Sequence, residues 1–445
     1  MDSTGSAMKV PADLEQRVSK RIVWRLVLPC ALFILMGSID RTNVGFAALQ
    51  MNADLGLSAT AYGFGAGVLF IGYVVAKYPS VLLYEAIGMR RWLAIIAIAW
   101  GLGATALAAV QNEWQLYGLR VWIGFAEGGL SSGLMLYLSH WATERYRATI
   151  LAIPITAISL SHVIGAPLSG WLLDVANPLG IAGWRFMFLV EGLPAIFLGL
   201  FALAWFPDSP AEARWLAPAE RTWLAQNVRG ATKPDKSGPM AGRWAALSSP
   251  VGWTCAFIWF CILASNYGIA YWLPQIVKGM TGLSATQTGI IVALPHAASA
   301  IGLVLNARHS DRTGERYLHI ALPALVGGAG LIGAYLAGPG LAGLALLVLG
   351  GACTGCTVAA FWAIPNRLLP PSGLAMGIVM INMIGSFAGA LMPPAMGWLK
   401  EETATFLAPT LLVCAVAVAC TLLCLFARHL QARSDARQPT VQGLA

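Results

Sequence analysis

Charged residues are scarce in this 445-residue chain, in which 11% of the residues are Asp, Glu, Lys or Arg and 58% are hydrophobic. A soluble globular domain has about 25% charged residues and about 45–50% apolar ones. So few charges cannot cover a soluble core of this size, which excludes a soluble enzyme, a nucleic-acid-binding protein and a secreted disulfide scaffold. The composition predicts an all-α protein that crosses a lipid bilayer many times.

Further absences narrow the function. The eight cysteines all lie in hydrophobic stretches, and no metal-ligand pattern surrounds Cys353 and Cys356, so we expect neither disulfides nor a metal site. No phosphate-binding glycine motif is present, which argues against an ATP-driven pump, and we expect no cofactor. The longest polar stretch, residues 207–249, holds no histidine, cysteine or nucleophile–base pair, which argues against a membrane enzyme or sensor.

Long hydrophobic stretches, by contrast, are plentiful. A helix needs about 20 mostly apolar residues to cross a bilayer. Twelve stretches meet this need, six before the polar stretch and six after it: 22–48, 60–84, 92–111, 114–140, 148–173, 185–206, 250–277, 286–306, 318–338, 341–364, 373–397 and 406–427. The sequence therefore predicts twelve transmembrane helices in two groups of six.

The domain organisation follows from these spans. We expect a tail at residues 1–21, a six-helix bundle at 22–206, a connector at 207–249, a second six-helix bundle at 250–427 and a tail at 428–445. Within the connector, apolar and charged residues from Glu212 to Leu224 favour a surface amphipathic helix. Residues 233–239 are typical of a flexible linker.

The positive charges predict the orientation. If both termini are cytoplasmic, 22 of the 28 Lys and Arg residues lie on the cytoplasmic side, and Arg185, Lys278 and Lys400 lie on the other. Because positive loops stay inside, we expect both termini in the cytoplasm. The expected location of this multi-pass protein is the plasma membrane, here the bacterial inner membrane. We expect it to act as a monomer.

Two loops share the pattern acid-x-x-Gly-x-Arg, one after the second span of each half. Their matching residues are Glu85, Gly88 and Arg90, and Asp311, Gly314 and Arg316. A repeat in register indicates duplicated halves, as in many carriers. The glycine favours a tight turn and the charges could hold neighbouring helix ends, which suggests conformational gates; ordinary charged loops are the alternative.

Several short segments add to this repeat. They are IDRTNVGFA (39–47), LRVWIGFAE (119–127), GWR (183–185), EGLP (191–194), PDSP (207–210), ARWL (213–216), Asn382 and GWLK (397–400). Together with the twelve spans they resemble the major facilitator superfamily, and within it the anion:cation symporter family of tartrate, phthalate, sugar-acid and 4-hydroxyphenylacetate permeases. The resemblance implies proton-coupled symport of a small organic anion by alternating access between two bundles. An exporter or an anion exchanger on the same fold is the alternative.

Ionisable residues inside the spans are the first candidates for the site, because each costs roughly 2.5–3.5 kcal/mol or more at the bilayer centre. The set is Asp40, Arg41, Lys77, Arg120, Glu127 and Glu191. Spacings of three, four or seven residues put Asp40 beside Asn43, Tyr73 beside Lys77, and Arg120 on one face with Glu127. Three polar faces from one half can therefore line one cavity; a purely structural ion-pair network is the alternative.

A proton could regulate this cavity. With Asp40 and Glu127 both ionised no positive charge is spare, whereas protonating one of them frees a cation for a carboxylate substrate. The resemblance to sugar-acid permeases implies the same assignment: proton coupling at Asp40 and Glu127, coupling and substrate binding at Arg41 and Arg120, and a substrate contact at Tyr73. We expect Glu191 to lie apart as a structural carboxylate.

The remaining candidates would set the substrate class. Many relatives have Glu at the position of Lys77, so a lysine there favours a dicarboxylate or an aromatic acid as substrate, unless it only balances charge or reaches toward the interface. The other expected substrate-binding residues are Asn43, Asn266, Trp362 and Asn382. Further candidates for substrate or proton contact are Tyr267, His162 and His296.

Overall fold

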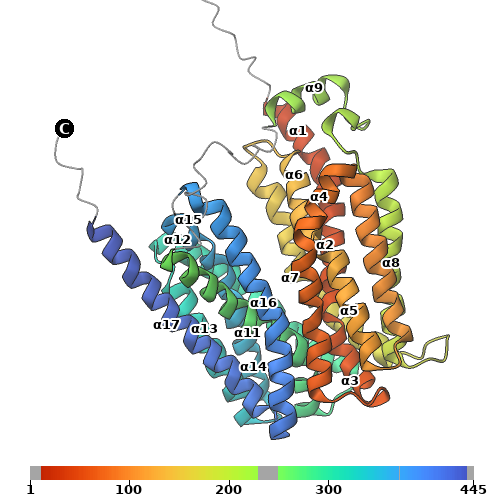
Figure 1. Ribbon diagram of the computed structural model, residues 1–445, viewed down its shortest axis with the longest axis vertical. Coiled ribbons are helices and arrows are strands. Elements are labelled where there is room, and N and C mark those ends of the chain that lie inside the picture. The colour runs from red at the N-terminus through yellow and green to blue at the C-terminus, as the bar shows by residue number, and fades with distance from the viewer. Residues whose placement is uncertain (1–11, 229–248, 370, 438–445) are drawn as a thin grey trace, which may run out of the picture.

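The computed structural model describes residues 12–228, 249–369 and 371–437, and the regular elements within these ranges are helices (Figure 1). The N-terminal half holds α1 (Ala12–Ile22), α2 (Leu28–Thr42), α3 (Val44–Asp54), α4 (Ala59–Ala106), α5 (Glu113–Glu127), α6 (Leu130–Ser139), α7 (Arg147–Asp174) and α8 (Gly183–Trp205). The C-terminal half holds α11 (Pro250–Thr281), α12 (Ala285–Thr313), α13 (Leu318–Ala337), α14 (Leu341–Phe361), α15 (Ala363–Leu368), α16 (Pro371–Thr403) and α17 (Leu407–Arg437). A short helix of the connector, α9, covers Pro218–Asn227.

Ten helices of the described chain are long and apolar enough to cross a membrane. Two further crossings complete the expected twelve. Helix α4 contains both the second and the third span, which meet at Gly88, where φ is 80° and the backbone is not helical. Helices α5 and α6 together make the fourth span, which breaks at Gly128 and Gly129. A side chain on either glycine would collide with α4, so the break lets the two helices approach closely.

Both outer ends of the helical region extend beyond the expected spans. The first helix begins at Ala12, well before residue 22, because Val18 on α1 is fully buried against the bundle. The last helix continues to Arg437, past residue 427. One reason is a hydrogen bond across the bundle: the Tyr317 hydroxyl and the side-chain amide of Gln431 on this extension are 2.5 Å apart.

The connector folds back onto the N-terminal half. Its helix starts at Pro218 rather than near Glu212, because proline suits a first helical turn and the Glu220 carboxylate accepts from the Ala217 amide at 2.9 Å. Leu224 is fully buried in the core of the bundle. The amphipathic face thus packs on protein, whereas the expected linker at residues 233–239 lies outside the described residues.

The two halves meet mainly at one end. We call the end that holds α9 and α15 the connector end, and the opposite end, near α3, the far end (Figure 1). Helix α4 packs on α16, and α7 packs on α12. In the described chain, the side-chain hydrogen bonds between halves lie at the far end, except for one from Lys77 to Ser386 midway along. Figure 1 shows the halves diverging toward the connector end.

Candidate functional site

An ion pair between Arg41 and Glu127 lies at the centre of the N-terminal half. Arg41 comes from the last turn of α2, and Glu127 is the last residue of α5 before the glycine break. The Arg41 Nη2 donates to Glu127 Oε2 at 2.9 Å and its Nε reaches the same oxygen at 3.3 Å. The second oxygen, Oε1, is buried and makes no hydrogen bond to any described residue. The positive charge of Arg41 is therefore neutralised within the N-terminal half.

Arg120 is held differently, although it shares a helix with Glu127. Its side chain is fully buried and donates to three backbone carbonyls, those of Gly65 at 3.2 Å, Arg41 at 3.2 Å and Ala66 at 3.4 Å. Its Nη1 makes no hydrogen bond within the described chain, and the same is true of the hydroxyl of Tyr271, whose ring centroid lies 6.0 Å from the guanidinium. A fixed cation with an unfilled donor suits an anionic ligand.

Asp40 belongs to a chain of neutral donors and carboxylates. It accepts from the Trp100 indole at 2.8 Å and more weakly from the Asn43 amide at 3.5 Å. The same amide donates to Glu191 at 2.8 Å, and Ser169 donates to the other oxygen of Glu191 at 2.7 Å. The expectation that Glu191 lies apart from the cavity residues is therefore wrong, since one amide links it to Asp40. The reason is that α8 packs on both α2 and α3.

A third cation, Lys77, lies beside the same tyrosine ring as Arg41, that of Tyr73. The Arg41 guanidinium and the Lys77 Nζ are each 5.1 Å from the centroid of the Tyr73 ring. Lys77 also donates to Ser386 of α16 at 3.1 Å. The Ser386 hydroxyl donates to the Asn382 carbonyl one turn earlier, at 2.8 Å. The sequence did not indicate Ser386, although its spacing of four from Asn382 puts both on one face.

The other candidates fall into two groups. At the interface between halves, Tyr267 packs on Phe70 with ring centroids 4.4 Å apart, and the rings of His162 and His296 lie 4.7 Å apart. This histidine pair lines a small cavity of about 20 Å³ together with Asn43 and Ser169.

Asn266 and Trp362 lie within the packing of the C-terminal half. The Asn266 amide donates to the carbonyl of Ile262 at 2.8 Å, and Trp362 packs edge-on against Trp259. The structure thus brings the residues of α2, α4 and α5 together but leaves these two with neighbours of their own half.

The two loops with matching patterns bind within their own halves. In the first, Arg90 bonds to the connector: its amide donates to Asp208 at 2.8 Å and its Nη2 to Glu212 at 3.2 Å. In the second, Arg316 pairs with Asp311 at 2.6 Å, and Gly314 has a φ of 69°. Gly88 and Gly314 both have positive φ, as the expected tight turns require. Their gating role stays a prediction.

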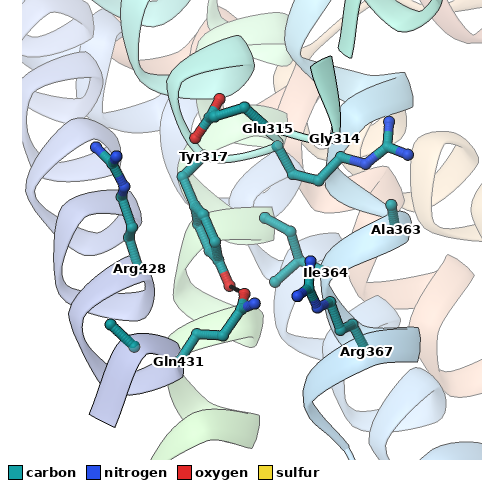
Figure 2. A pocket seen from close by; sticks show the side chains of 10 residues that line it. Gly314, Glu315, Tyr317, Ala363, Ile364, Arg367, Arg428 and Gln431 are labelled. Carbon is teal, nitrogen blue, oxygen red and sulfur yellow. Dashed lines mark hydrogen bonds between the residues drawn. The ribbon is translucent and has the colours of Figure 1, made fainter. Parts of the chain in front are cut away.

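A pocket of about 210 Å³ lies beside the second loop, at the connector end of the C-terminal half. Figure 2 shows Arg367 and Arg428 beside it and the bond between Tyr317 and Gln431. Its lining comes from the segment 314–317, α15 and α17, and therefore not from the helices that hold Arg120 and Glu127.

Known proteins share this architecture. Residues 30–393 and 281–443 match the family model described as Major Facilitator Superfamily. The chain belongs to this family. A protein of Agrobacterium vitis named "Putative tartrate transporter" is 38% identical over 406 residues, which cover 89% of this chain and 88% of that protein. A protein of Acinetobacter baumannii named "Quinolone resistance transporter" is 34% identical over 393 residues, covering 88% and 90%.

Among solved structures, a bacterial homologue of the human lysosomal transporter Spinster, in an inward-facing and unoccupied conformation, matches with a TM-score of 0.73 at 17% identity, covering 97% of this chain and 100% of that one. This likeness shows the fold. The predicted family and the predicted twelve-helix fold are confirmed. The protein is a multi-pass membrane protein and a secondary transporter of a small molecule, and not an enzyme.

Proposed function

We propose that this transporter carries a small organic anion, favouring dicarboxylates, together with protons. The observation that carries the proposal is the contrast between two buried arginines of one half. Arg41 is neutralised by Glu127, whereas Arg120 has no carboxylate partner within the described chain and an unfilled Nη1. Burying a charge without a partner is costly, and a bound carboxylate would supply that partner. A relative named for tartrate, a dicarboxylate, supports this substrate class.

The first carboxylate of the substrate would bind Arg120. The Tyr271 ring centroid lies 6.0 Å from the same guanidinium, and its unfilled hydroxyl offers a second donor. An arginine fixed by three carbonyls needs little rearrangement to bind, so its donors are already oriented. This contact would account for binding of any carboxylate.

The proton would act through Glu127. Protonating this carboxyl removes its charge and releases Arg41, whose guanidinium lies against Tyr73. Arg41, and Lys77 beside the same ring, could then hold a second carboxylate. A proton and an anion would thus enter the cavity together. Asp40 is held by neutral donors, so it can exchange a proton without breaking an ion pair.

The arrangement of the halves supports alternating access. Bonds between halves lie at the far end and midway, and the halves diverge toward the connector end. The positive loops favour a cytoplasmic connector end in the bacterial inner membrane, so this conformation would be open to the cytoplasm. We propose that the protein works as a monomer, because one chain supplies all the charged residues of the proposed site.

Export is the second candidate function. The relative named for quinolone resistance favours it, because resistance requires drug to leave the cell. The two functions differ in which way a proton gradient drives the substrate. An exporter would exchange protons for substrate, whereas a symporter would move both in one direction.

Radiolabelled tartrate uptake into proteoliposomes would test the proposal. We expect accumulation when the outside is acidic, and its loss in Arg120→Gln. The matched control is Arg185→Gln, which removes an arginine that donates to a carbonyl outside the cavity. A failure of tartrate to accumulate would contradict the proposal, and so would an equal loss of uptake in the two variants. Accumulation that requires an acidic interior would favour exchange.

A further inference from the structure

Two carboxylates at the far end cap helices of the opposite half. Asp174, the last residue of α7, accepts from the amide of Thr286 at 2.7 Å and from its hydroxyl at 2.8 Å, in the first turn of α12. Glu401, near the end of α16, accepts from the amide of Thr60 at 2.9 Å, in the first turn of α4. A carboxylate that fills unpaired amides at a helix start is stabilising. Here each such bond exists only while the halves touch.

Glycines let the helices meet closely beside both caps. A side chain on Gly170 or Gly289 would collide with the α7–α12 crossing, at the carbonyls of Ala285 and Ala166 respectively. The α4–α16 crossing is built the same way. There, a side chain on Gly63 or Gly397 would collide with the carbonyls of Pro393 and Ala59. Each carboxylate therefore follows a close glycine contact by one helical turn.

The two crossings also share a sequence. The segment GLSAT, followed by two residues and a glycine, occurs at 56–63 and again at 282–289. The partner helices carry GWLLD at 170–174 and GWLKE at 397–401, so glycine precedes the acid by four residues in both. The same four positions thus build both contacts: a capping serine, a threonine amide, a glycine and an acid. The arrangement is a duplicated device rather than two unrelated bonds.

We infer that Asp174 and Glu401 are paired latches that hold the far end of the transporter closed. This inference rests on the proposed alternating access and adds the residues that set its balance. Opening the far end must separate α4 from α16 and α7 from α12, so both caps must break. Because the latches are equivalent by position, removing either should favour opening to a similar degree, and their effects should multiply.

Cysteine accessibility would test the latches. Ala166 is 5% exposed and lines the small cavity between the halves, so Ala166→Cys would report on opening. A membrane-impermeant maleimide, added from the far side without substrate, would label it only when that side opens. The parent with alanine at this position corrects for the eight native cysteines.

We expect Asp174→Ala and Glu401→Ala each to speed labelling about 5-fold, which is the change in the opening equilibrium expected from the loss of a typical helix cap. The double variant should be labelled about 25-fold faster. Asp174→Asn and Glu401→Gln keep an acceptor oxygen and should have smaller effects. The matched control is Glu402→Ala, which removes an exposed neighbouring charge and should change nothing.

An unchanged rate in the double variant, or the same acceleration in Glu402→Ala, would overturn the latch inference. If an alanine variant folds poorly, Asp174→Asn and Glu401→Gln still test the inference, because both should be labelled faster than Glu402→Ala. Labelling needs neither substrate nor a proton gradient. A latch effect in a protein that does not move tartrate would therefore reject the proposed substrate and leave the latches standing.

Discussion

The two halves share a fold but differ in the chemistry of their interiors. The N-terminal half buries Asp40, Arg120, Glu127 and Glu191, each at most 4% exposed. The candidate residues of the C-terminal half are amides, aromatic rings and a histidine. Ser386 and the backbone of Tyr271 meet the N-terminal half through neutral groups. The difference indicates that duplication preserved the helix contacts while charge became concentrated in one half.

The sharpest test of this contrast is Arg120→Ala. Truncating a buried charge that binds an opposite charge costs roughly 2–5 kcal/mol, so tartrate affinity should fall at least about 30-fold. Isothermal titration on purified protein would measure it. Asn382→Ala, the counterpart from the neutral half, should lower affinity only a few-fold. Equal losses in the two variants would remove the distinction between halves.

Glu127→Gln should separate binding from coupling. Glutamine resembles the protonated acid, so Arg41 stays released and the anion site stays receptive. We expect counterflow of labelled tartrate to continue, while accumulation driven by a proton gradient and its pH dependence are lost. Full gradient-driven accumulation by this variant would assign the coupling elsewhere.

Lys77→Gln should change selectivity more than affinity for simple acids. The lysine Nζ lies 5.1 Å from the centroid of the Tyr73 ring, as the Arg41 guanidinium does, and there it could hold the second carboxylate. Competition assays should show about 10-fold weaker binding of dicarboxylates and little change for monocarboxylates, within the range for a charged contact. Equal effects on both classes would leave Lys77 as a charge-balancing residue.

The smallest effect is expected for Asn266→Ala. Its amide bonds to the Ile262 carbonyl of its own helix, so little of it is available to a substrate. Affinity should change less than about 2-fold while thermal stability falls by about 1 kcal/mol. A large loss of affinity with unchanged stability would bring Asn266, and with it the neutral half, into the binding site.

Much of the architecture could be predicted from the sequence, because hydrophobic runs and positive loops follow directly from the bilayer. The shared face of Arg120 and Glu127 also followed, since a spacing of seven residues puts both on one side of a helix. The pairing of Arg41 with Glu127 could not be predicted, because contacts between side chains of different helices depend on how the helices pack. Glu191 was misplaced for the same reason, as no spacing rule relates α8 to α2.

The far-end contacts were predictable but missed. The repeats at 56–63 and 282–289 are visible in the sequence, as are the GWL segments that precede Asp174 and Glu401. Small residues near the start of a helix indicate a close helix crossing only when the partner helix is known. The structure identifies that partner helix.

The most direct test of the central claim is the proton movement that accompanies the anion. Tartrate would be added to proteoliposomes that hold a pH-sensitive dye and have no imposed gradient. We predict that the wild-type protein acidifies the interior as tartrate enters, and that Glu127→Gln exchanges tartrate without any change in the dye signal. Tartrate entry without acidification in the wild type, or equal acidification in both proteins, would contradict proton coupling in the charged half.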